Sequence, residues 1–342
     1  MTVVERLRGT GILRLGSMKS GFRYRYAEKG KPGRRVIERI RELKVPPAWR
    51  EVAISRSPRA AIQAVGRDAA GRWQYLYHRS AVARREEKKY RRLIAFTRAL
   101  PALRKQVATD LARSGIGRER VLASMLRVVS LCFLRPGSDE YASENGSYGI
   151  ATLRRNHVQV RGSRVQFRFT GKSGQAQESE IGDRRVAAVV RALLRQPGGR
   201  LFRFRHEDGD LVDVRRGHIN AYIKEVMGAR FSAKDFRTWA GTMICACALS
   251  RAGFDEDDSP AQVRAKIVAA VKETAAGLGN TPAVCRSSYI APRLVRAYES
   301  RRVLSHRPAS LAILARSRSG RLQRCERALL RLLEGGGRVV PP

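Results

Sequence analysis

The spacing of hydrophobic positions divides this chain into a β-rich first part and a mainly helical remainder. Residues 21–27 and 61–66 alternate or run with aromatic and β-branched side chains, which is typical of strands. Between them, residues 34–45 carry apolar side chains at helical spacing until two prolines end the pattern. Residues 66–78 read as a hairpin with a turn rich in Gly and Asp. Residues 1–78 are therefore expected to be mostly β.

Helical periodicity dominates from Ser80 onward. The basic amphipathic run at 81–115 is expected to be helical with an interruption at Pro101, and residues 118–134 are apolar on most faces, as a core helix would be. Further helices are expected at residues 184–196, 218–228, 237–253 and 259–279. The acidic stretch 255–259 between the last two reads as a solvated loop.

Residues 157–181 switch to a period of two. Turn signals at Gly162-Ser163 and at residues 171–174 divide them into three short antiparallel strands, with Lys172 at the second tip. The fold class is therefore α+β: a small β-rich domain at 1–80, then a mainly α-helical domain at 81–305 that carries a three-stranded antiparallel sheet. Residues 306–342 read as a basic C-terminal tail that contains one amphipathic helix.

The charge balance narrows the class of partner. In 342 residues, 69 Lys and Arg stand against 30 Asp and Glu, a formal net charge of +39. A surface this basic binds polyphosphates, less often anionic membranes. The chain has no apolar run of the length that spans a membrane and no apolar signal core at MTVVERLRGTG, so we expect a cytoplasmic protein.

Cysteine and histidine are too sparse and too scattered to suggest a metal site or a disulfide framework. Neither a CxxC pair nor a His cluster occurs, so we expect no metal, no cofactor and buried reduced thiols. The five cysteines are Cys132, Cys245, Cys247, Cys285 and Cys325.

Two segments in the C-terminal third carry the most suggestive chemistry. AKDFRTWAG (233–241) holds Lys234 and Arg237, and LGNTPAVCRSSYIAP (278–292) holds Asn280 and Tyr289. Guanidiniums can hold a phosphodiester while a phenol oxygen attacks phosphorus. Taken singly, each residue also has an ordinary structural explanation: Arg237 pairing with Asp235 near a helix start, Asn280 as a left-handed helix cap, and Tyr289 as a half-buried amphipathic side chain.

Two further cations could join them. Arg135 follows the apolar helix at 118–134, where an arginine commonly caps carbonyl groups. GKS at 171–173 superficially suggests a phosphate-binding loop, but Gln166 stands where that motif needs glycine, so Lys172 reads as an ammonium group on a hairpin tip.

Several long motifs, in order, resemble type IB DNA topoisomerases of the small bacterial and poxvirus kind. In the first half these are GFRYRYA (21–27), LKVPPAWREVAI (43–54) and IQAVGRDAAGRWQYLYH (62–78). In the second half they are LRPGSDEYASENGSYGIATL (134–153), VRGSRVQFRFTGKSG (160–174), KDFRTWAGT (234–242) and LGNTPAVCRSSYI (278–290).

This resemblance implies a role for each matching residue. Tyr289 matches the nucleophile, Arg135 and Arg237 the arginines that hold the scissile phosphate, and Lys172 the general acid. Lys234 matches a lysine that assists proton transfer, and Asn280 falls where many members have histidine and some asparagine. The matching DNA contacts are Gln74, Tyr75, Tyr77, Gly137 and Tyr141. Two departures, Ser138 in place of asparagine and the SSYIAP flank, touch no catalytic group.

The resemblance implies an enzyme that relaxes supercoiled duplex DNA without ATP or metal. A 3′-phosphotyrosyl intermediate, strand swivelling and religation would follow, by a monomer that clamps DNA at the nucleoid. Two alternatives stay open. A site-specific tyrosine recombinase shares the chemistry, although those enzymes generally carry histidine where Lys234 stands and have a helical N-terminal domain. A non-catalytic basic architectural protein would bind DNA by charge alone.

Overall fold

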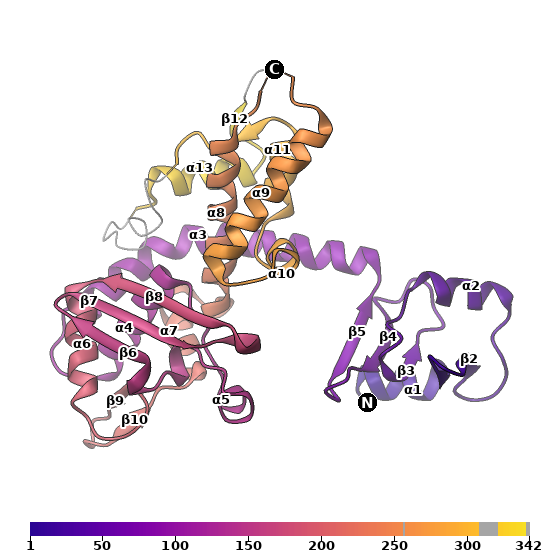
Figure 1. Cartoon of the computed structure of the whole chain (residues 1–342), viewed down its shortest axis with the longest axis horizontal. Coiled ribbons are helices and arrows are strands. Elements are labelled where there is room, and N and C mark those ends of the chain that lie inside the picture. The colour runs from indigo at the N-terminus through magenta and orange to yellow at the C-terminus, as the bar shows by residue number, and fades with distance from the viewer. Residues whose placement is uncertain (256, 308–320, 340–342) are drawn as a thin grey trace. The chain divides into compact units, whose positions relative to one another are not determined.

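The structure, a computed structural model, describes residues 1–255, 257–307 and 321–339. The chain forms two compact units, Met1–Arg91 and Arg92–Pro342, and the boundary falls inside the long helix α3 (Arg79–Asp110) (Figure 1). The predicted α+β class is confirmed, because the first unit is built on a β-sheet and the second is mainly helical with a three-stranded antiparallel sheet.

The first unit is a five-stranded antiparallel sheet with strand order β2-β1-β3-β4-β5. Its elements are α1 (Val3–Thr10), β1 (Ile12–Ser17), β2 (Gly21–Tyr26), α2 (Arg34–Glu42), β3 (Arg50–Ile54), β4 (Ile62–Arg67) and β5 (Trp73–Tyr77). Helix α2 buries Ile40 against Ile12 and Ile54 of the sheet. The strands predicted at 21–27 and 61–66, the helix at 34–45 and the hairpin at 66–78 are confirmed.

The predicted interruption at Pro101 is wrong. Helix α3 continues through this proline to Asp110. A proline inside a helix removes one hydrogen bond and crowds the preceding turn. Here its ring is buried, and Leu100 and Leu103 beside it are buried in the core, so tertiary packing outweighs the local cost.

The second unit packs helices around the buried helix α4 (Arg118–Cys132), whose Leu122, Met125 and Val129 are fully buried. The other helices are α5 (Asp139–Asn145), α6 (Arg184–Leu194), α7 (Arg216–Met227), α8 (Ala233–Ala252), α9 (Pro260–Leu278), α10 (Pro282–Ser288), α11 (Pro292–Glu299) and α13 (Arg324–Leu333). The short hairpin of β9 (Arg203–Arg205) and β10 (Leu211–Asp213) was not predicted.

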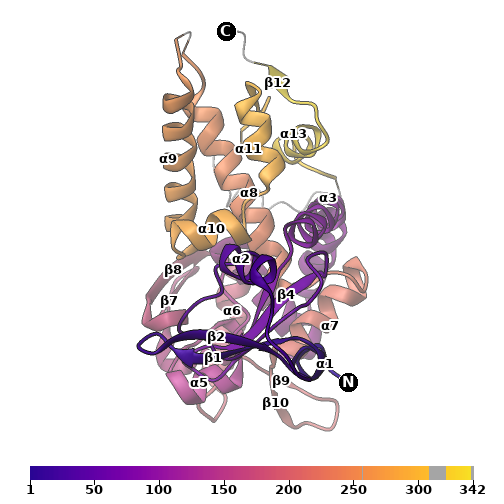
Figure 2. The same cartoon turned by 90° about the vertical axis from the view of Figure 1, so that its right-hand side faces the viewer.

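The sheet of the second unit is the predicted three-stranded antiparallel one, in the order β6-β7-β8. Its strands are β6 (Val158–Arg161), β7 (Arg164–Thr170) and β8 (Ala176–Gly182). Lys172 lies in the turn between β7 and β8, as predicted. In two perpendicular views this hairpin lies next to α10 (Figures 1 and 2).

Helix α8 begins one turn earlier than predicted, at Ala233 rather than at Arg237. The reason is a capping box, in which Ser232 and Asp235 satisfy each other's backbone donors. Arg237 therefore lies in the second turn, facing the core, and does not open the helix.

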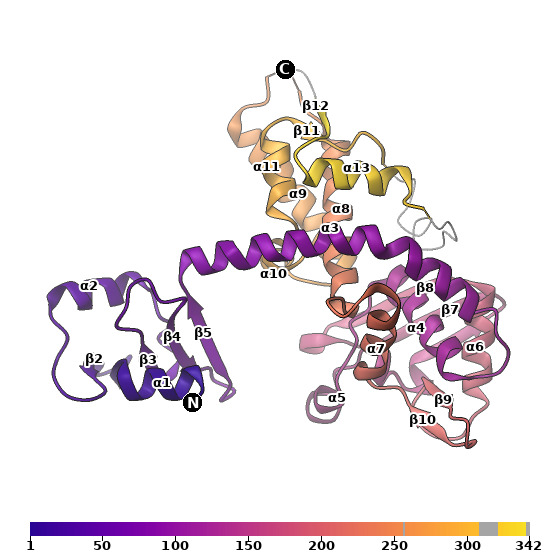
Figure 3. The ribbon, with the colours of Figure 1, turned by 180° about the vertical axis from the view of Figure 1, so that it is seen from behind.

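Part of the C-terminal segment is folded onto the second unit. The predicted amphipathic helix is α13, and strand β11 (Arg302–Val303) pairs antiparallel with β12 (Arg338–Val339) (Figure 3). Glu326 of α13 is fully buried and forms a bidentate ion pair with the buried Arg104 of α3. Residues 308–320 and 340–342 of the predicted tail lie outside the described residues.

The acidic stretch 255–259 is a loop whose described residues are mostly exposed, as predicted, but the side chain of Asp258 is buried. Lys266 of α9 binds Asp255 at 2.8 Å and Asp258 at 2.6 Å, and the Asp258 side chain is 1% exposed. Residue 256 lies outside the described part of the chain. Within the part that the structure describes, none of the helices is both long and apolar enough to cross a lipid bilayer.

Candidate active site

Arg135 is placed by the end of the core helix α4. Phe133, the residue after that helix, adopts the left-handed conformation (φ 52°) and turns the chain. Arg135 then reaches the α9–α10 junction, where its Nη2 donates to the side-chain Oδ1 of Asn280 and, at 3.3 Å, to the backbone oxygen of Gly279. Arg135 therefore contacts the segment that carries Asn280 and does not merely cap its own helix.

Arg237 is buried, with 4% of its surface exposed. One guanidinium nitrogen donates to the backbone oxygen of Phe133 and the other to that of Leu278, at 2.7 Å. These two carbonyls end α4 and α9, so one side chain joins the segments that lead to Arg135 and Asn280. Its guanidinium carbon lies 5.0 Å from the ring centre of Tyr289.

Asp235 does not pair with Arg237. It accepts hydrogen bonds from Arg92 of α3, at 2.7 Å from Nε and 2.5 Å from Nη2, and it caps α8 through Ser232. The ordinary explanation offered by the sequence for Arg237, a carboxylate neighbour, is therefore not the arrangement seen.

Asn280 does not act as a left-handed helix cap. Gly279 takes that conformation (φ 58°, ψ 54°), while the backbone N–H of Asn280 donates to the oxygen of Ala275 at 3.0 Å. The side-chain oxygen of Asn280 accepts from Arg135, and its nitrogen makes only a long contact of 3.5 Å with the backbone oxygen of Leu278.

Tyr289 ends the short helix α10 and is held from behind by α8. Thr242 is fully buried; its hydroxyl donates to the backbone oxygen of Tyr289 at 3.1 Å and accepts from the N–H of Ala291 at 3.2 Å. A Cβ on Gly241 would lie 2.9 Å from the Cβ of Tyr289, so glycine is needed there for close approach. Sequence reasoning missed Gly241 and Thr242.

The positive charges around Tyr289 outweigh its burial. Burial would raise the pKa of the phenol, but the charge and hydrogen bonding of Arg237, then the charges of Arg135 and Lys234, lower it below its ordinary value. Burial and the charge of Arg237 lower the pKa of Arg135, while Tyr289 acts in the opposite sense. The phenol of Tyr289 therefore loses its proton more easily than a free tyrosine does.

The two lysines lie at different distances from this centre. Lys234, in the first turn of α8, is exposed and near enough for its charge to act on Tyr289. Lys172 is exposed at the tip of the β7–β8 hairpin and, among the described residues, makes no hydrogen bond or ion pair. The structure brings Arg135, Arg237, Asn280, Lys234 and Tyr289 together, with Lys172 on the neighbouring hairpin.

Comparison with known proteins identifies the family to which this chain belongs. Residues 78–302 match the model of the eukaryotic DNA topoisomerase I catalytic core, and residues 21–68 match that of the bacterial DNA topoisomerase IB N-terminal domain. The chain is 34% identical over 269 residues to DNA topoisomerase 1B of Acanthamoeba polyphaga mimivirus, covering 77% of this chain and 80% of the relative. It is 22% identical over 246 residues to DNA topoisomerase 1B of vaccinia virus (strain Copenhagen), covering 70% and 73%.

This chain belongs to the type IB DNA topoisomerase family. The resemblance inferred from the motifs is thereby confirmed, and DNA is the partner on which this family acts. The recombinase alternative loses its basis, because the β-rich first unit matches a topoisomerase IB domain.

In this type IB topoisomerase, Gly137 is a structural necessity. Its φ is +83°, and a Cβ would lie 2.9 Å from the hydroxyl of Thr152 and 3.0 Å from the Cα of Gly149. The turn leads into α5, where Tyr141 is 49% exposed.

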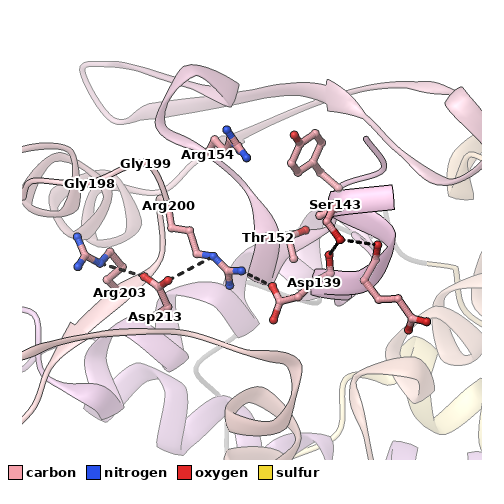
Figure 4. A pocket seen from close by; sticks show the side chains of 12 residues that line it. Asp139, Ser143, Thr152, Arg154, Gly198, Gly199, Arg200, Arg203 and Asp213 are labelled. Carbon is pink, nitrogen blue, oxygen red and sulfur yellow. Dashed lines mark hydrogen bonds and ion pairs between the residues drawn. The ribbon is translucent and has the colours of Figure 1, made fainter. Parts of the chain in front are cut away.

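A cavity of about 570 Å³ lies beside α5 (Figure 4), and Tyr289 is not among the residues that line it. Arg200 spans it, pairing with Asp139 of α5 and, at 3.4 Å, with Asp213, which also pairs with Arg203 at 3.0 Å. None of α5's residues is buried, and the ion pair between Asp139 and Arg200 links the start of this helix to the β9–β10 region.

The predicted DNA contacts of the first unit share the edge strand β5. Tyr75 and Tyr77 stack with ring centres 6.3 Å apart, and Tyr75 is 38% exposed. Gln74 donates to Asp68 at 2.8 Å across the hairpin turn. Two exposed or half-exposed aromatic rings on one strand provide a surface suited to stacking or groove contact.

Proposed function

We propose that this enzyme relaxes supercoiled duplex DNA by transient cleavage of one strand, without ATP or metal, through a 3′-phosphotyrosyl intermediate. Tyr289 attacks phosphorus in line, while Arg135 and Arg237 bind the non-bridging oxygens. Negative charge grows on those oxygens in the transition state, and fixed guanidiniums stabilise it without any change of protonation.

The observation that carries this proposal is the convergence on Tyr289. Arg237 lies against the phenol ring, Arg135 is bonded to the Asn280 side chain, and the pKa of Tyr289 is lowered despite its burial. These positive groups provide charge that metal ions provide in other nucleases.

Asn280 and the lysines complete the proposed mechanism. The amide N–H of Asn280 donates to a non-bridging oxygen and cannot carry a proton as histidine would, so its contribution is electrostatic. Lys172 protonates the leaving 5′-oxygen as general acid, assisted by Lys234.

Religation needs no external energy, because the phosphotyrosyl link conserves the bond energy of the broken phosphodiester. The free 5′-hydroxyl end swivels between cleavage and religation. We propose that a monomer clamps the duplex, with residues 1–80 as a DNA-clamping domain and 81–305 as the catalytic domain. The net charge of +39 supports tight, salt-sensitive binding to phosphates and association with the nucleoid.

The test is relaxation of a supercoiled plasmid in EDTA without ATP, comparing the wild type with Tyr289→Phe. We expect the wild type to relax any plasmid, and Tyr289→Phe to bind DNA with unchanged affinity but to form no covalent adduct. Relaxation by Tyr289→Phe, or an adduct on another residue, would refute the assignment. Binding without nicking by the wild type would indicate an architectural protein.

A further inference from the structure

Gln177 of β8 is packed between two glycines, each of which directly precedes a proposed catalytic residue. A Cβ on Gly171 would lie 2.6 Å from the Cγ of Gln177, and a Cβ on Gly279 would lie 3.0 Å from both its Nε2 and its Oε1. Gly171 precedes Lys172 and Gly279 precedes Asn280. One side chain thus fills the space between two segments that come from distant parts of the chain.

Position 171 needs glycine for steric reasons and not because of its backbone conformation. Gly171 has an ordinary backbone conformation (φ −93°), which any residue adopts. A larger side chain there would collide with Gln177, whose position is fixed because it pairs with Phe169 in the β7–β8 ladder. The requirement for glycine before Lys172 therefore comes from Gln177.

The tight turn of the hairpin places Lys172 directly after Gly171, next to the contact with Gln177. The N–H of Gly171 donates to the oxygen of Gln175 at 2.7 Å, and Ser173 (φ 62°) and Gly174 (φ 73°) complete a tight turn. Lys172 has no side-chain partner of its own among the described residues, so the place of its ammonium group depends on where the turn lies.

The other side of Gln177 touches the anchored part of the site. The oxygen of Gly279 accepts from Arg135 at 3.3 Å, and its N–H closes the end of α9. Arg135 and Arg237 both bond to the segment 278–280, which gives the hairpin a fixed support.

We propose that Gln177 is a positioning residue that seats the Lys172 turn against the Gly279–Asn280 segment. It thereby aligns the ammonium group of Lys172 with the leaving oxygen. This inference rests on the proposed function, since it acts through the general acid.

Gln177→Ala removes both contacts. We expect single-turnover cleavage at saturating DNA to slow by about 10- to 100-fold, because small displacements of a catalytic group cost rates of this order. DNA affinity should stay unchanged. Gln177→Met, which keeps the Cγ and the length of the side chain, should restore most of the rate. The matched control is Gln175→Ala, an exposed glutamine of the same hairpin. A wild-type rate in Gln177→Ala would overturn the proposal.

A substrate with a 5′-bridging sulfur identifies the step that is affected. A thiolate leaves without protonation, so defects that act through a general acid disappear on it. We expect Lys172→Ala and Gln177→Ala both to approach the wild-type rate on this substrate, while Arg135→Ala stays slow. If Lys172→Ala recovers and Gln177→Ala does not, the inference fails and the proposed function stands. If Lys172→Ala does not recover, the general-acid assignment fails and the inference fails with it.

Discussion

Tyr289 is subject to two opposing effects: burial, which disfavours the phenolate, and the surrounding cations, which favour it. The cations prevail, with Arg237 contributing most. Asp235 is hydrogen-bonded to Arg92 and Ser232, so this carboxylate does not pair with Arg237 and does not neutralise its charge. The phenol of Tyr289 therefore ionises more easily than a free phenol.

Arg237→Gln should raise the pKa of Tyr289. Burial raises this pKa, and the variant removes Arg237, which lowers it most, leaving the charges of Arg135 and Lys234. In the wild type the pKa of Tyr289 lies below its ordinary value. The variant raises this pKa, so the rise in cleavage rate with pH should move to higher pH. Difference spectra between proteins with and without Tyr289→Phe measure the ionisation directly.

The matched control for that titration is Arg286→Gln, which removes an exposed arginine of α10 three residues before Tyr289. This variant should leave the pKa of Tyr289 unchanged. An unshifted titration in Arg237→Gln would contradict the electrostatic account.

At this scale the sequence motifs pointed to residues that the structure places close to one another. Arg135, Arg237, Asn280 and Tyr289 were all predicted and lie together. Gln177 was not predicted, because its importance depends on two contacts with segments distant in sequence, and neither a charge nor a motif marks it.

Among the elements, α8 does most to assemble the site. Arg237, Gly241 and Thr242 lie on adjacent turns of one helix, so Arg237 and the support for Tyr289 share one rigid frame. The separation between the Arg237 guanidinium and Tyr289 thus depends on helix geometry rather than on a loop.

Thr242→Val should weaken this frame. It leaves the backbone oxygen of Tyr289 and the buried N–H of Ala291 without their described partner, at a cost of about 1–3 kcal/mol in the free energy of unfolding. Cleavage should slow by about 10-fold or more as Tyr289 shifts. Denaturant unfolding and single-turnover cleavage measure the two effects, with Thr242→Ser, which keeps the hydroxyl, as the control. Wild-type cleavage by Thr242→Val would show that Tyr289 needs no such support.

Periodicity located most elements, and the errors have physical causes. Helix α3 passes Pro101 because burial of the ring compensates for the lost bond, which local sequence does not reveal. The early start of α8 could have been predicted from the sequence, since Ser232 and Asp235 form a capping box. Thr242 had no readable signal, because a buried threonine in an apolar helix resembles any core residue.

On the scale of the whole second unit, residues far beyond Tyr289 complete its core. Helix α13 buries Leu329, Leu330, Leu332 and Leu333, and its Glu326 neutralises Arg104 inside the protein. The sequence predicted a basic tail with one amphipathic helix, but it did not show that this helix packs into the core, because the buried partner Arg104 lies far away in the chain.

Glu326→Gln should destabilise the second unit by about 3 kcal/mol or more, because it leaves Arg104 buried without a counter-charge. Denaturant unfolding measures this loss. The double variant Arg104→Met with Glu326→Leu should recover much of it, since apolar packing can replace a buried ion pair. Glu334→Gln, which removes an exposed pair with Arg98, is the matched control and should cost little. Equal effects of the two single variants would contradict a structural role for the buried pair.

The pairing of Arg104 with Glu326 spans 222 positions of the chain. At ribosomal speeds of about 5–20 residues per second, Arg104 waits roughly 10–45 seconds for its counter-charge during synthesis. A nascent polypeptide that has just exposed Tyr289 already holds every group proposed for strand cleavage, but its interior is unfinished. Completion of the fold, and with it a durable DNA-cutting enzyme, is thereby delayed until translation has passed well beyond the nucleophile.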